Sequence, residues 1–199
     1  MDDAILTERP LRCRMKFDIL ERCEMTKSQR RRANRLNRIL KDKVLHWYTR
    51  RAALSIEART MRAKANSWRG FNVGSSGVGV LPTGEIRHYA GYNVKAAEGP
   101  RLHSDHCAEP FLIEQAEADG CVEIFGITTE APYQPDDFSG LDLGVTTMCV
   151  YCRRFLRKKL LDPKSAVKKD TLLFFVNGDD PTRHVQFSVE QLLRLYDDA

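Results

Sequence analysis

Apolar residues recur along the chain at two different spacings, and each spacing predicts a different kind of element. From about residue 26 to residue 65 they return every three or four positions, with Arg and Lys between them. This pattern predicts amphipathic helices, the second of them over about residues 49–65. From Phe71 the pattern changes. The segments FNVGSSGVGV and EIRHYAGYNV, joined by the turn-forming PTGE, predict a β-hairpin.

The rest of the chain alternates further helices with strands. A helix is expected to begin near Cys107 and to end before Gly120, with Phe111, Leu112 and Ala116 on its buried face. CVEIFGIT predicts a third strand, residues 130–144 an irregular acidic loop, and the segment from Cys149 a helix. TLLFFVNG and HVQFSV predict two strands, and SVEQLLRLYDDA predicts a closing helix.

The link between those last two strands is too short for a parallel crossover, so we expect them to pair antiparallel. The complete order is helix, strand, strand, helix, strand, helix, strand, strand, helix. It predicts an α/β fold in which helices pack on a mixed five-stranded sheet.

Composition narrows the class of protein. No apolar run is long enough to span a bilayer, and the first residues do not look like a secretory leader, so we expect a cytoplasmic protein with reduced thiols. Its six cysteines are then ligands, nucleophiles or core residues rather than a disulfide framework. The net charge of +5 combines a basic stretch over residues 1–70 with a mildly acidic remainder.

Three of the cysteines stand where helices are expected to start. Cys149 and Cys152 form a Cys-x-x-Cys motif, and Cys107 opens the earlier helix. The positive end of a helix favours thiolates, and three thiolates around one Zn²⁺ would leave its fourth position open, as in a catalytic zinc site. Glu109 is placed to exchange protons with a water in that position. His106 is the weaker alternative to Cys107 as a ligand.

These motifs resemble the cytidine deaminase family, in particular its free-nucleoside branch, over about residues 49–199. CAEPFLIEQA is close to the family's Cys-Ala-Glu helix, and MCVYCRRFL to its Pro-Cys-x-x-Cys-Arg helix. FNVGSSGVGV and GYNVKAA are similar to two further family segments. The resemblance implies a three-layer α/β/α fold, a Zn²⁺ cofactor and a homo-oligomer, dimeric or tetrameric. It also implies two parts of the chain, a basic helical extension over residues 1–48 and a catalytic domain over residues 49–199.

The resemblance also assigns roles to individual residues. It implies Cys107, Cys149 and Cys152 as zinc ligands and Glu109 as the proton shuttle for attack by a zinc-bound hydroxide. It implies Arg153 as a hydrogen-bond donor to a zinc-bound thiolate. The remaining residues that it implies contact the substrate: Phe71, Asn93, Lys95 and Ala108.

The chain departs from the family pattern at several positions. Met148 replaces a proline, and Pro110 replaces an arginine in a first helical turn, where proline costs no hydrogen bond. Lys95 replaces a glutamate that grips the sugar. Because an ammonium group only donates hydrogen bonds and attracts anions, this change suggests a phosphorylated or acidic ligand.

The predicted function is hydrolytic deamination of a cytosine-containing nucleoside or related small molecule, giving uridine or deoxyuridine and ammonia. Three alternatives stay open. The basic N-terminal helices could bind nucleic acid and deliver a single-stranded polynucleotide. The chain could be a catalytically inactive binding module. The Cys-x-x-Cys pair could also belong to a structural zinc site or a redox pair.

Overall fold

The computed structural model describes residues 50–65, 71–94, 107–134 and 143–196. The first predicted basic helix, the boundary at residue 48, Lys95 and His106 lie outside these residues. Within the described part of the chain, no helix is long and apolar enough to cross a membrane.

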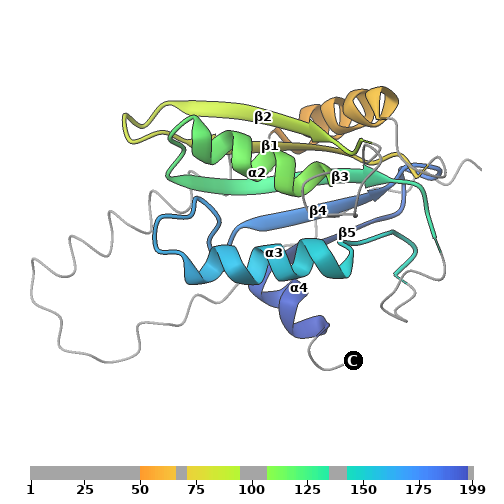
Figure 1. Cartoon of the computed structure of the whole chain (residues 1–199). Coiled ribbons are helices and arrows are strands. Elements are labelled where there is room, and N and C mark those ends of the chain that lie inside the picture. The colour runs from red at the N-terminus through yellow and green to blue at the C-terminus, as the bar shows by residue number, and fades with distance from the viewer. Residues whose placement is uncertain (1–49, 66–70, 95–106, 135–142, 197–199) are drawn as a thin grey trace, which may run out of the picture. The chain divides into compact units, whose positions relative to one another are not determined.

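The elements follow the predicted order along the chain (Figure 1). A helix over residues 50–64 comes first, at the position expected for the second basic helix. The others are β1 (Gly74–Val80), β2 (Ile86–Tyr92), α2 (Ala108–Ala118), β3 (Glu123–Ala131), α3 (Val150–Leu161), β4 (Leu172–Asn177), β5 (His184–Ser188) and α4 (Val189–Leu195).

The strands form one mixed sheet in the order β2-β1-β3-β4-β5. β1 pairs antiparallel with both β2 and β3, and β3 pairs parallel with β4. β4 and β5 pair antiparallel, as the short link between them predicts. The expected α/β fold with a mixed five-stranded sheet is confirmed.

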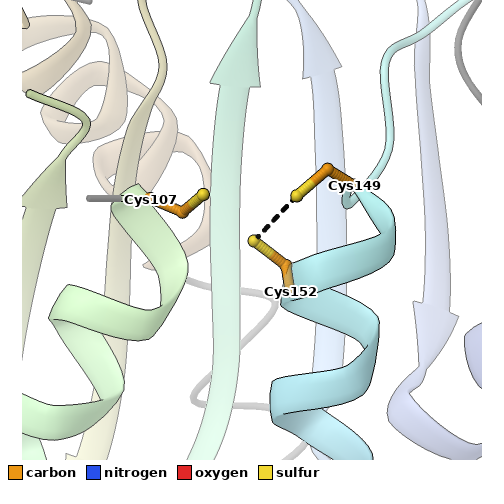
Figure 2. A group of neighbouring side chains, drawn as sticks. All are labelled: Cys107, Cys149 and Cys152. Carbon is orange, nitrogen blue, oxygen red and sulfur yellow. Dashed lines mark hydrogen bonds between the residues drawn. The ribbon is translucent and has the colours of Figure 1, made fainter. Parts of the chain in front are cut away.

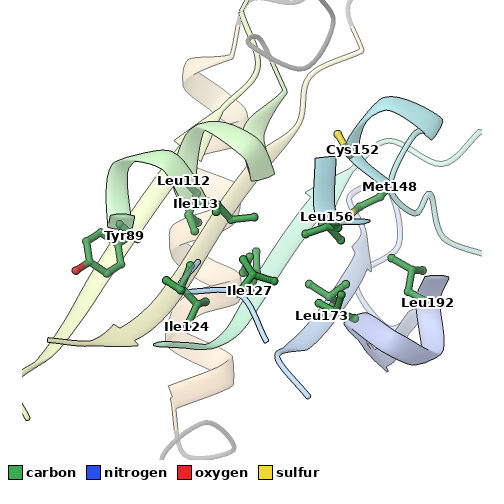
Figure 3. Packing of buried hydrophobic residues seen from close by; sticks show 14 of the residues in the cluster. Tyr89, Leu112, Ile113, Ile124, Ile127, Met148, Cys152, Leu156, Leu173 and Leu192 are labelled. Atoms are coloured by element: carbon green, nitrogen blue, oxygen red, sulfur yellow. The ribbon is translucent and has the colours of Figure 1, made fainter. Parts of the chain in front are cut away.

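Helices cover both faces of this sheet, which gives three layers. On one face α2, α3 and α4 bury the larger core, to which they contribute Leu112, Leu156 and Leu192 and the sheet contributes Leu173 (Figure 3). On the other face Leu54, from the helix over residues 50–64, belongs to a smaller core with Val78. β4 has apolar residues in both cores, Leu173 and Phe175 in the larger and Phe174 and Val176 in the smaller, as expected of a central strand covered on both faces.

A β-bulge in β3 shifts the alternation of its side chains. The pairing with β1 shifts between Val78 and Gly79, so that these residues face Gly126 and Ile124 while Phe125 is the extra residue. As a result Ile124 lies in the same core as Ile127, three residues away, whereas Phe125, two residues from Ile127, lies in the opposite core.

Two details of the sequence-based prediction were wrong. The acidic segment after β3 is not irregular from residue 130, because Glu130 and Ala131 pair with β4 and belong to the strand. Phe111 does not lie on the buried face of α2: it is 45% exposed, and its ring lies beside Tyr92. The buried stripe of α2 instead includes Ile113.

The helix over residues 50–64 is expected to be an integral part of this fold. Replacing fully buried Leu54 by alanine should lower the free energy of unfolding by about 3 kcal/mol, because it leaves a cavity between the helix and the sheet. The matched control is Ile56→Ala in the same helix, where the side chain is 66% exposed and the change should stay within about 0.5 kcal/mol. Urea unfolding measures both, and equal losses would contradict the packing described.

Candidate metal centre and active site

The first helix start at the site belongs to α2, which follows Cys107. Cys107 is the N-cap, with extended backbone and a carbonyl that accepts from the Phe111 amide at 3.2 Å. α2 lies close against β2 because Gly91 has no side chain: a Cβ there would come within 2.5 Å of the Ala108 carbonyl oxygen. Pro110 lies in the first turn, where its missing N–H costs nothing.

The second helix start belongs to α3, whose N-cap is Cys149. The preceding Thr146 and Thr147 hold this start in place. The Thr146 hydroxyl donates to the Pro132 carbonyl at 2.7 Å, just after β3. The Thr147 hydroxyl hydrogen-bonds the Tyr196 hydroxyl at the end of α4. The thiol-bearing turn is therefore fastened both to the sheet and to the C-terminal helix.

The sulfurs of Cys107, Cys149 and Cys152 converge on one point between α2 and α3 (Figure 2). All three lie within 4.8 Å of one another, and those of Cys149 and Cys152 are 3.4 Å apart. A tetrahedral zinc with Zn–S bonds of about 2.3 Å separates its sulfurs by about 3.8 Å. The spacing is close to that of a zinc site and much longer than the S–S bond of a disulfide, which is about 2.05 Å.

The electrostatics of the cluster also suit a cation. Hydrogen bonds from the Cys107 and Cys152 thiols lower the pKa of Cys149, and the amides of Cys152 and Tyr151 add to this effect. The same mutual contacts raise the pKa values of Cys107 and Cys152. Without a cation the cluster therefore favours one thiolate and two thiols. A divalent ion would balance the charge of further thiolates.

Glu109 lies beside this cluster in the first turn of α2 and is only 5% exposed. Its Oε2 is 3.9 Å from the Cys152 sulfur. Burial raises the pKa of Glu109 to about 7, and the nearby Cys149 thiolate contributes to the increase. A carboxyl group with a pKa near neutrality can both accept and return a proton, which is what general acid–base catalysis requires.

Two residues that sequence reasoning missed support Glu109 from the sheet. The Thr129 side chain on β3 lies near enough to the Glu109 carboxyl group to lower its pKa, against the larger effect of burial. Its hydroxyl also lies 2.9 Å from that of Ser75, its partner on β1. Both residues are buried. The signal in the sequence was a pair of hydroxyl residues in each strand, Ser75 and Ser76 in β1 and Thr128 and Thr129 in β3.

Arg153 is buried behind the cluster. Its guanidinium donates to the Met148 carbonyl at 2.5 Å and lies 3.7 Å from the centre of the Tyr196 ring. These contacts fix the residue that precedes Cys149. The predicted hydrogen bond from Arg153 to a zinc-bound thiolate stays a prediction.

Three of the predicted substrate contacts lie near the start of β1. Half-buried Phe71 packs against a small apolar cluster that includes fully buried Ala108, the residue between Cys107 and Glu109. The Asn93 side chain accepts from the Val73 amide and donates to the Phe71 carbonyl, each at 2.7 Å. Asn93 thus holds Phe71 in place, and contact of either residue with a substrate stays a prediction.

Cys121 lies apart from the metal centre. It is buried in the larger core, and its thiol donates to the Glu123 carbonyl at 3.3 Å. It is therefore a core residue, and it provides a cysteine control for experiments on the cluster.

Comparisons with known proteins give matches among solved structures alone. No protein-family model matches the sequence, and no curated protein matches it. Cytidine deaminase from Burkholderia pseudomallei matches with a TM-score of 0.48 and 21% identity, over 71% of this chain and 94% of that one. Cytidine deaminase from Mycobacterium leprae gives 0.43 and 21%, over 71% and 95%. The Mycobacterium tuberculosis enzyme gives 0.42 and 18%, over 71% and 92%.

Proposed function

We propose that this protein is a zinc-dependent hydrolytic deaminase that acts on the cytosine ring of a nucleoside or related small molecule. The observation that carries the proposal is the convergence of three cysteine sulfurs from two helix starts, with a buried carboxyl group beside them. The Cys-Ala-Glu and Cys-x-x-Cys motifs supply the same four residues from the sequence.

Cys107, Cys149 and Cys152 would hold the Zn²⁺. A bound Zn²⁺ supplies a Lewis acid that lowers the pKa of water and polarises the reacting group. Among the described residues the cluster offers three ligands, so one tetrahedral position would be left for water or substrate.

Glu109 would move the proton. In the hydrolysis, the oxygen of water bonds to C4 of the ring and the exocyclic amine leaves as ammonia. The Glu109 carboxylate takes a proton from the water and returns it to the departing amine. Thr129, whose hydroxyl is held by that of Ser75, would help to orient the carboxyl group during both transfers.

Phe71 and Asn93 would form the substrate side of the site. Phe71 is held by Asn93 next to Ala108, so its ring can flank a base whose reacting carbon lies at the thiol cluster. Aromatic faces of this kind stack on nucleobases. Lys95 would add a cation near the sugar.

Ammonia release from a panel of cytosine compounds tests the proposal. The panel contains cytosine, cytidine, deoxycytidine, their monophosphates and a short oligonucleotide, with adenosine as the control. We expect ammonia from at least one of the cytosine compounds, with the uracil product formed in equal amount. Faster turnover of the monophosphates would agree with the role suggested for Lys95. Failure of the zinc-loaded protein on every cytosine compound would reject the proposed function.

A further inference from the structure

Within residues 71–199 the basic residues are concentrated in one place. Residues 71–199 contain thirteen Lys and Arg, and eight of these fall within residues 150–169, beside a single acid, Asp162. This segment comprises α3 and the loop that follows it. The other parts of residues 71–199 are strongly acidic, so the cations of α3 are segregated rather than dispersed.

On α3 the exposed residues form one stripe. Tyr151, Arg154, Lys158 and Leu161 follow one another at spacings of three and four residues, and all four are exposed. Lys164, in the turn just after the end of the helix, is also exposed. The opposite face, with Cys152 and Leu156, is buried in the core. Tyr151 and Lys158 are about 10 Å apart along the axis, the length of about three stacked nucleotides.

The cations of the stripe are not committed to other groups of the described chain. Lys159 pairs with Glu117, and the Lys168 ammonium donates to the Ser165 carbonyl. Among the residues that the structure describes, Arg154, Lys158 and Lys164 form no ion pair.

Stabilisation of the helix does not explain Arg154. Cations near the C-terminal end of a helix are favourable, which accounts for Lys158 and Lys159 in the last turn. Near the N-terminal end the helix dipole favours acids instead, yet the first turn of α3 contains none, and Arg154 follows directly after that turn. A negatively charged binding partner would account for the cation at Arg154.

An exposed aromatic ring lies at the end of the stripe nearest the thiol cluster. Tyr151 is 43% exposed and stands between Cys149 and Cys152 in the first turn of α3. Cations that follow a phosphate backbone, combined with an aromatic ring on which a base stacks, are the features of proteins that bind single strands.

We infer that the outer stripe of α3 (Tyr151, Arg154, Lys158 and Lys164) binds a single-stranded polynucleotide. Arg154, Lys158 and Lys164 contact successive phosphates, and Tyr151 stacks on a base next to the thiol cluster. These residues belong to positions 151–164 of the sequence and not to the basic N-terminal extension over residues 1–48. Presentation of a cytosine of the bound strand to Glu109 is a further step, and it rests on the proposed function.

A membrane surface fits the stripe less well. Helices that lie on membranes insert an apolar face between the lipids. The apolar face of α3 is already buried against the sheet, and Leu161 is the one exposed aliphatic side chain of the stripe, which is too little for insertion.

The test measures binding of a fluorescent single strand of about 16 nucleotides to the full chain. It compares the parent with the triple variant Arg154→Gln, Lys158→Gln, Lys164→Gln. The matched control is Arg87→Gln, Arg183→Gln, Arg194→Gln, which removes the same charge from cations already paired with acids. All proteins also carry Glu109→Gln, so that binding is measured without turnover.

We expect the stripe variant to bind at least about tenfold more weakly at low salt, and its salt slope to fall by about 2, since each single-strand phosphate contact contributes about 0.7. Tyr151→Leu should weaken binding of the single strand about tenfold, whereas Tyr151→Phe should bind it as tightly as the parent. A duplex of the same sequence should bind equally well to the parent and to Tyr151→Leu. Equal losses in the control, no binding of the strand, or binding to anionic phosphatidylserine vesicles alone would overturn the inference.

A second measurement separates this inference from the proposed function. With Glu109 intact, the stripe variant should deaminate free cytidine at the parent rate and a cytosine within the strand about tenfold more slowly, in line with its weaker binding of the strand. If neither substrate is deaminated, the proposed function fails while the binding result stands. If both are deaminated at parent rates, the stripe does not deliver substrate.

Discussion

Replacing Glu109 by glutamine is expected to lower kcat for cytidine deamination by about 10³-fold, because glutamine cannot accept and return the proton. The amide is nearly the same size as the carboxyl group, so the buried first turn of α2 should keep its packing. Zinc content should stay at the parent level, since the three cysteines rather than Glu109 are the proposed ligands. Steady-state kinetics and metal analysis on the same preparation measure both quantities.

The matched control for this variant is Glu114→Gln. Glu114 is a carboxylate on the same helix, but it is exposed and does not face the cluster. Its replacement should leave kcat and zinc content unchanged. Loss of zinc in Glu109→Gln would show that Glu109 is a ligand, and a kcat close to that of the parent would show that it is not the proton carrier.

Loss of any one of the three clustered thiols is expected to remove the metal. Cys149→Ser and Cys152→Ser each leave two sulfurs at the site. Loss of a residue that only hydrogen-bonds a metal ligand lowers metal affinity by about 10- to 100-fold, and loss of a ligand should lower the affinity for zinc further. Activity should disappear with the metal. Zinc per chain after dialysis, followed by competition with a chromogenic chelator, measures the effect.

Cys121→Ser is the control for the thiol variants. Cys121 is buried in the larger core and belongs to no cluster of possible ligands among the residues described. Its replacement should lower stability slightly and leave zinc at the parent level. Equal zinc loss in Cys121→Ser would mean that the metal depends on the general integrity of the fold rather than on the cluster.

The sequence was sufficient to predict the order of the described elements and the four residues that the structure brings together. Hydrophobic periodicity is a local property, and it located the described strands and helices closely. The proximity of Cys107, Glu109, Cys149 and Cys152 could be predicted because their spacing places them at helix starts, so their geometry depends mostly on the helices that carry them.

The surroundings of these residues could not be predicted in the same way. The contact between Thr129 and Ser75 depends on the register between β1 and β3, and the two residues are 54 positions apart in the sequence. The hydrogen bond between Thr147 and Tyr196 joins residues 49 positions apart. The bulge at Phe125 shifts the alternation of β3 without any glycine or proline at that residue. Each feature arises from tertiary packing, which no local pattern encodes.

The exposure of Phe111 has a similar cause. Helical spacing places it next to the buried stripe of α2, but the close approach of α2 to β2 at Gly91 rotates that stripe toward Ala108 and Leu112. Sequence spacing alone does not determine how a helix is rotated on its sheet.

X-ray absorption at the zinc edge, on protein purified without added chelator, tests the central claim most directly. The account predicts one zinc per chain, with three sulfurs at about 2.3 Å and one lighter atom at about 2.0 Å. A shell of four sulfurs, a shell without sulfur, or a metal-free protein whose Cys149 and Cys152 are joined in a disulfide would contradict it.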